Sequence, residues 1–237
     1  MKVDEQYPLA AVFLRNELET LRYIKDSSMF EKHYNQLSRD ATVKYFKLHS
    51  SMKKLQSFNF VSEIDICLDR KSSRTGKAVI GADVEINSEH YEKVSYFLAI
   101  CEDKNPQSRL VRKYHFDYDL YDPKGRQPHP VFHLQYAGKL SAYLDTLNLD
   151  HAHIDSWLSE PRLFYMPMSL ALLLNLVLKE FNTEVTQKII ESSEWRQVIR
   201  KNEELLLAPY FKSCHNYMAG FGNSNNLLTT DYLYGKQ

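Results

Sequence analysis

The sequence predicts an α+β protein in which helices at both ends flank a mostly antiparallel sheet of about five strands. Near both ends, apolar residues recur at three- and four-residue spacing, which is typical of amphipathic helices. Through the middle they alternate with polar residues, which is typical of half-buried strands. The 237 residues suit a single domain: helical over 1–58, sheet over 60–138, helical over 140–220, with C-terminal helices packed on one face and a tail at 221–237 that we expect to be mobile or docked on a partner.

Two helical segments precede the predicted sheet. Residues 8–25 carry one apolar stripe, and residues 29–58 carry a near-heptad stripe. One long helix over 29–58, or two helices with a bend near 38–40, would both fit this spacing. The segment would either pack on the sheet or form a coiled-coil arm for a partner, and the first is favoured.

The sheet follows as a run of alternating segments joined by short connections. Consecutive strands with short loops usually pair with their neighbours. The fourth and fifth strands carry aromatic residues on one parity, which we expect to be core. The third is apolar on both parities and reads as a central strand. The five predicted strands cover 61–69, 78–86, 94–102, 110–119 and 131–137, with a basic turn at 71–77 between the first two.

The C-terminal part reads as helices, and one of them is apolar all round. The segment 167–181 should therefore be central to the core. Its apolar run, 164–178, is shorter than the roughly 20 residues that cross a bilayer, so we expect no membrane span. The predicted helices cover 140–149, 154–158, 167–181, 183–190, 194–207 and 209–219.

Charge and cysteine content limit the function classes. The chain has 30 basic and 30 acidic residues, and this zero net charge argues against a broad nucleic-acid footprint. Its three cysteines, Cys67, Cys101 and Cys214, form no CxxC pair, which favours reduced thiols in a cytoplasmic protein. Sixteen tyrosines and twelve phenylalanines favour association surfaces. The common nucleophile, nucleotide-binding and zincin motifs are missing from the sequence.

The first candidate site is the polar parity of the fourth and fifth strands. His115 and Asp117 lie two residues apart, so they project from one face, and His133 can face them from the next strand. Two imidazoles and a carboxylate could bind Zn, Mn or Fe, or act as an acid–base pair. A solvated sheet face, or a structural network of histidines and carboxylates, would carry the same residues, and these interpretations are favoured.

A second candidate adds four acids to the same face: Glu63, Asp65, Asp83 and Glu85. With Lys113, they suggest the carboxylates and lysine of a metal-dependent nuclease. The acid-x-Lys spacing of such enzymes is absent, so a solvated acidic face is the favoured interpretation.

Two further groups lie in predicted connections. Lys71, Arg74 and Lys77 are candidates for non-specific phosphate contacts, although solvated loops carry such charges as well. His151 and His153, with nearby aspartates, could form a metal site, but exposed polar residues of a connection are the favoured account.

Three motifs in order carry a resemblance to a known family: HFDYD at 115–119, HPVFHLQYAG at 129–138, and a Pro-Arg pair before PMSLALLLNLVLKEF at 167–181. Over about 111–181, the chain resembles the small middle subunit of Lamassu-type anti-phage and anti-plasmid systems, which are built on an ABC or SMC-like ATPase. The resemblance implies a non-catalytic role, bridging the ATPase to a nuclease effector. It assigns no functional residues.

The leading hypothesis is therefore a non-catalytic interaction subunit of a bacterial defence complex. Its partners would be an SMC-like or ABC ATPase and a nuclease effector, with nucleic acid reached through the complex and with no cofactor. The expected interface residues are Tyr121, Arg126, Tyr232 and Tyr234. The alternative is a metal-dependent hydrolase, a nuclease or toxin-like enzyme, that uses the histidine–aspartate set of the first candidate site.

Overall fold

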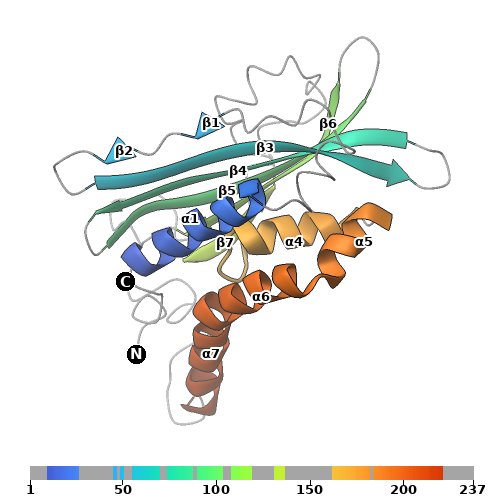
Figure 1. The fold of residues 1–237 in the computed structure, drawn as a ribbon. Coiled ribbons are helices and arrows are strands. Elements are labelled where there is room, and N and C mark those ends of the chain that lie inside the picture. The colour runs from blue at the N-terminus through green and yellow to red at the C-terminus, as the bar shows by residue number, and fades with distance from the viewer. Residues whose placement is uncertain are drawn as a thin grey trace.

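A computed structural model shows two layers, a twisted sheet and a set of helices that cover one of its faces (Figure 1). The predicted α+β class and the placement of the C-terminal helices on one face are confirmed. The structure describes residues 10–26, 45–46, 49–50, 55–69, 74–87, 90–103, 108–118, 131–136, 162–181 and 184–220.

The sheet is an antiparallel meander. Its strands are ordered β1-β3-β4-β5-β6-β7-β8, and β2 also pairs with β3. The five predicted strands are confirmed as β3 to β7, although β3, β4 and β5 extend beyond their predicted ends. The strands are β1 Tyr45–Phe46, β2 His49–Ser50, β3 Leu55–Asp69, β4 Arg74–Asn87, β5 His90–Glu102, β6 Arg109–Tyr118, β7 Phe132–Tyr136 and β8 Arg162–Phe164.

The helix predicted over 29–58 is wrong wherever the structure describes it. Its second half holds β1, β2 and the start of β3. Phe58 and Phe60 continue the period-two pattern of the later β3 residues, and they align with Val84 and Ala82 of β4. This ladder of strand pairing overrides a helical spacing that the same apolar residues also satisfy. The first half of the predicted segment, 29–44, lies outside the described residues.

The sheet is also wider at its other edge than predicted. The short strand β8 lies inside the part that we expected to be helical, and it pairs with β7. Three residues are too few to show a period-two signal, so the sequence does not reveal this strand.

The other predicted helices agree closely with the structure where it describes them. The predicted break near residue 208 is wrong, because α6 and α7 are joined by a π-helical turn, η3. The segments 140–149 and 154–158 lie outside the described residues. Among the described helices, none is long and apolar enough to cross a membrane. The helices are α1 Ala10–Asp26, α4 Leu170–Glu180, α5 Glu184–Glu191, α6 Ser193–Asn202, η3 Glu203–Leu207 and α7 Ala208–Gly220.

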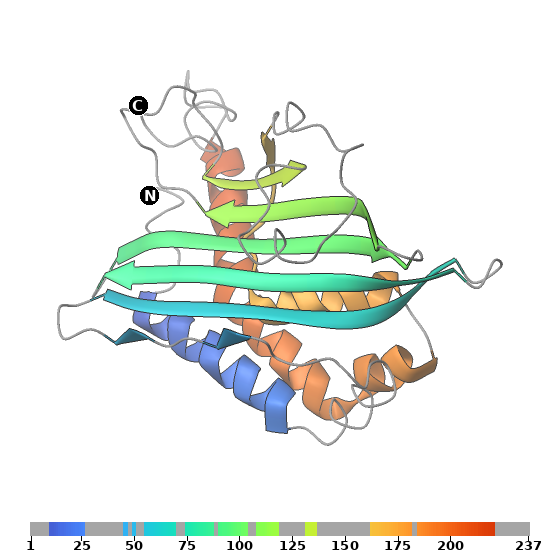
Figure 2. The ribbon, with the colours of Figure 1, turned by 90° about the horizontal axis from the view of Figure 1, so that it is seen from above.

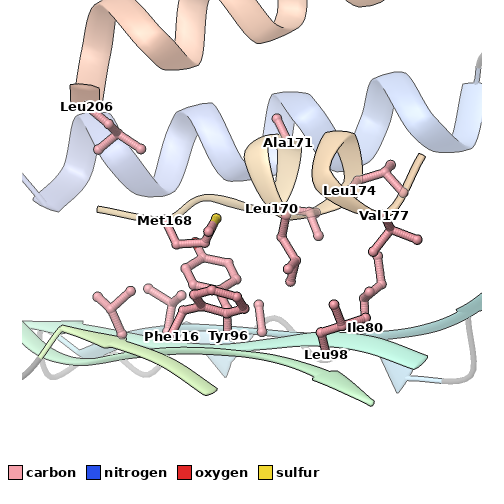
Figure 3. Packing of buried hydrophobic residues seen from close by; sticks show 14 of the residues in the cluster. Ile80, Tyr96, Leu98, Phe116, Met168, Leu170, Ala171, Leu174, Val177 and Leu206 are labelled. Carbon is pink, nitrogen blue, oxygen red and sulfur yellow. The ribbon is translucent and has the colours of Figure 1, made fainter. Parts of the chain in front are cut away.

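The apolar helix α4 lies at the centre of the core, as predicted. It packs between the sheet and the other helices, and Figure 3 shows Leu170 and Val177 above side chains of the central strands such as Tyr96 and Leu98. Its N-terminus is capped twice. The Ser169 hydroxyl accepts from the Leu172 N–H at 3.3 Å, and the Leu170 N–H donates to Oε2 of Glu17, a buried carboxylate on α1, at 2.9 Å. These caps fix where α4 crosses the sheet.

Candidate functional site

The first candidate set lies on the sheet face opposite the helices, which Figure 2 views from above. Asp117 of β6 aligns with His133 of β7, and His115 aligns with Gln135 on one side and Phe97 on the other. Nε2 of His133 lies 3.7 Å from Oδ2 of Asp117. The structure therefore brings Asp117 and His133 into contact, which the predicted strand pair allowed.

His115 does not complete a metal site with these two residues. Its ring packs beside the ring of Phe97, with 6.4 Å between the ring centroids. Within the described part of the chain, no group of three His, Cys, Asp or Glu side chains is arranged to hold a metal ion. The Asp117–His133 contact instead fits the structural-network interpretation, in which a carboxylate orients an imidazole.

The centre of this face is shielded from solvent. His133 and Lys113 are only 2% and 3% exposed, and their apolar neighbours Val79, Ala99 and Cys101 are buried as well. None of the described helices covers this side of the sheet (Figure 1). The central strands are thus largely buried on both faces, and Lys113 and His133 lie in an interior where charge is costly unless it is compensated.

The acidic candidates lie at separate positions along β3 and β4 in the strand register. Asp83 aligns with Ser95 of β5, which in turn aligns with Asp117. Two strand spacings therefore separate these aspartates, about 10 Å. Two metal ions that act together lie about 4 Å apart, so this pair of acids is too far apart for two-metal phosphate chemistry. In the strand register, Glu63, Asp65 and Glu85 lie opposite Val79, Lys77 and Lys93.

The three basic hairpin candidates do not share one environment. Arg74 starts β4, and its Nε donates to Oε1 of the buried Glu102 at 2.8 Å. Lys77 is half-buried, opposite Asp65 and Cys101 in the register. Lys71 lies outside the described residues. Arg74 thus already binds the carboxylate of Glu102, at the end of β5. This ion pair competes with any phosphate contact.

The expected interface residues, Tyr121, Arg126, Tyr232 and Tyr234, also lie outside the described residues, as do His151 and His153. Their assignment stays a prediction.

The structure reveals an exposed apolar surface that the sequence reasoning missed. Six large apolar side chains are exposed among the described residues, and five of them lie on β7, β8 and α7. We call these five the apolar edge: Tyr136, Leu163, Phe164, Phe211 and Met218. The buried Tyr210 of α7 links this helix to β8, because its ring stacks on that of Phe164 with 6.3 Å between the ring centroids. The Tyr210 ring also contacts the ring of Phe211 edge-on, with 5.4 Å between the centroids.

The α7 part of the apolar edge is exposed because of how this helix packs against the rest of the protein. Tyr210 and Ser213 face the body of the protein and are buried, whereas Phe211 and Met218, seven residues apart, lie together on the outer side of the helix. Figure 1 shows α7 leading away from the sheet, so its outer side meets no other described element. The seven-residue spacing of Phe211 and Met218 was the only signal of this surface in the sequence.

Comparison with protein-family models, with curated proteins and with solved structures finds no match.

Proposed function

We propose that this chain is a non-catalytic interaction subunit that docks on a protein partner through the apolar edge. The observation that carries the proposal is the gathering of five exposed large apolar side chains at one margin of the fold. Exposed large apolar side chains that lie near one another mark interaction sites in many water-soluble proteins.

The residue types of the apolar edge favour a protein partner. Aromatic residues and methionine are enriched in protein–protein interfaces, and charged residues are depleted at interface centres. Among the described residues of α7, Lys212 is the only lysine, arginine, aspartate or glutamate. β8 is an edge strand of only three residues. Such a short edge limits pairing with strands of other chains, while its side chains stay accessible to a partner.

The partner that we propose is the one implied by the resemblance: an SMC-like or ABC ATPase of a bacterial anti-phage or anti-plasmid defence complex. A nuclease effector would be the second partner. Zero net charge favours contact with nucleic acid through these partners instead of through this chain.

The test is co-purification from the native host with a tag at the N-terminus, followed by mass spectrometry. We expect a stoichiometric ATPase with the unaltered chain and its loss with Phe211→Glu, because a buried carboxylate in an apolar interface is costly. Val12→Glu is the matched control, since Val12 is similarly exposed (46% against 54%) but lies on α1. Recovery of the same partner with Phe211→Glu, or of no ATPase with the unaltered chain, would contradict the proposal.

The metal-dependent hydrolase is the weaker alternative, because only Asp117 and His133 of its proposed set are in contact. Metal analysis of the same purified sample tests it. Near one equivalent of a transition metal, lost in His133→Gln with the fold retained, would reverse the ranking of the two functions.

A further inference from the structure

A cavity of about 370 Å³ lies between α4 and the sheet, on the helix-covered face. α4 contacts β4 and β5, and the cavity lies where the sheet continues beyond this cover to β6 and β7. Leu98 and Phe116 line the cavity on the sheet side, and Figure 3 shows both side chains pointing from the sheet toward the helix layer. The floor and roof are apolar, formed by Leu98, Ile100, Phe116 and Leu134 of the sheet and by Leu176, Val177 and Phe181 of the helix end.

The size and lining of this cavity fit a small molecule. Well-packed interiors hold few voids larger than a water molecule, whereas small-molecule sites span about 300–1,000 Å³ with mostly apolar walls. A ligand with an apolar body would therefore find here a contact surface that the protein's own side chains leave unfilled.

Polar groups at the rim select the head group of that molecule. Arg112 and Tyr114 lie two residues apart on β6, and their positions align with Ile100 and Leu98 of the floor. The guanidinium and the phenol both donate hydrogen bonds, so together they match an acceptor with two oxygens. Burial raises the pKa of the Tyr114 and Tyr165 hydroxyls, the second of which is also on the rim, so both remain neutral donors near pH 7.

Arg112 is the only cation among the lining residues, and no carboxylate holds it among the described residues. Its Nη1 donates to the carbonyl of the preceding residue, Val111, at 3.2 Å. Glu180, at the end of α4, also lines the cavity, and its charge acts on the Tyr114 hydroxyl in the direction opposite to that of Arg112. An anionic head group would therefore bind nearest to Arg112, the group whose charge attracts it.

We propose that this cavity binds a small monocarboxylic acid with an apolar body. The carboxylate accepts hydrogen bonds from Arg112 and Tyr114, and the body lies between the end of α4 and strands β5 to β7. This site uses none of the residues of the proposed docking surface, so each proposal can fail without the other.

Calorimetric titration of the full chain with octanoate and with octanol tests this inference, because the two probes share a chain and differ in the head group. We expect octanoate to bind at least about tenfold more tightly than octanol, since a charge-assisted hydrogen bond contributes at least that factor. Arg112→Gln should remove the advantage of octanoate and leave octanol binding unchanged. Arg22→Gln, which alters an exposed arginine on α1, should change neither affinity.

A second variant tests where the apolar body lies. Leu176→Trp places a larger side chain in the roof of the cavity and should weaken both probes by a similar factor. Equal affinities of octanoate and octanol for the unaltered chain, or an octanoate advantage that survives Arg112→Gln, would overturn the proposal. An absence of saturable octanoate binding would overturn it as well.

Discussion

Glu17 gives the sharpest prediction, because a buried carboxylate ties the stability of this fold to pH. The side chain is wholly buried on α1, and burial raises its pKa from 4.5 to about 7. The Leu170 N–H and the side chains of Tyr96 and Asn16 act in the opposite direction but do not cancel the cost of burial. The perturbation is Glu17→Gln, which keeps the shape and an acceptor oxygen and removes the titration.

The magnitude follows from the two pKa values. Between about pH 4.5 and pH 7 the folded state holds a proton that the unfolded state has lost, so the free energy of unfolding falls as pH rises through this window. A gap of about two and a half units corresponds to about 3 kcal/mol. Below this window Glu17 is protonated in both states, and above it the folded state bears the full cost of a buried charge.

Urea unfolding of the wild type and of Glu17→Gln, measured from about pH 5 to about pH 8, isolates this contribution because other groups titrate equally in both proteins. We expect the difference in unfolding free energy to shift by up to about 3 kcal/mol in favour of Glu17→Gln across this range. Glu194→Gln, which makes the same change at an exposed position of α6, is the matched control. A difference that is constant for Glu17→Gln would refute the reasoning.

Two further predictions concern packing, and both are measured as urea unfolding midpoints. Leu173→Ala should lower the free energy of unfolding by about 2–5 kcal/mol, because it empties a wholly buried position of α4. Lys179→Ala, at an exposed position of the same helix, should change it by no more than about 0.5 kcal/mol. Equal losses for the two variants would contradict the central place of α4 in the core. Gly76→Ala should cost at least about 2 kcal/mol, because its Cβ would lie 2.1 Å from the carbonyl oxygen of Cys101 on the paired strand. Wild-type stability of Gly76→Ala would show that β4 and β5 can separate there at little cost.

The parts of the fold that could be predicted are those in which a long segment repeats one period. β5 is the clearest case: Tyr96 to Ile100 are apolar on both parities, and all five are buried, as expected for a central strand. α4 is apolar all round and lies in the core. The aromatic parity of β6 faces the helices, with Phe116 and Tyr118 buried.

The failures arise where two periods fit the same residues or where the segment is very short. The apolar positions from Tyr45 to Phe58 satisfy a helical spacing, but pairing with β4 decides the outcome beyond Leu55. β8 has only three residues. In both places contacts between distant segments determine the structure, and a local pattern does not contain them.

The candidate site divides in the same way. Strand pairing allowed Asp117 and His133 to face one another if the register was right, and in the structure they are in contact. The burial of their face could not be predicted, because alternation along a strand shows only that its two faces differ and not how much water reaches each. The cavity and the apolar edge depend on where α4 ends over the sheet and on how α7 leaves it, and both are properties of helix placement.

The π-helical turn η3 makes the orientation of the last helix, and so of the proposed docking surface, depend on chain length. A π turn contains one residue more than an α turn, and each residue of an α-helix rotates the next by about 100°. Removal of one residue from Glu203–Leu207 would restore a continuous α-helix and turn α7 about its own axis by that angle. Phe211 would leave the outer surface, and Tyr210 would lose its contact with Phe164 of β8. Related chains that keep the same docking surface should therefore tolerate substitutions at 203–207 far better than insertions or deletions.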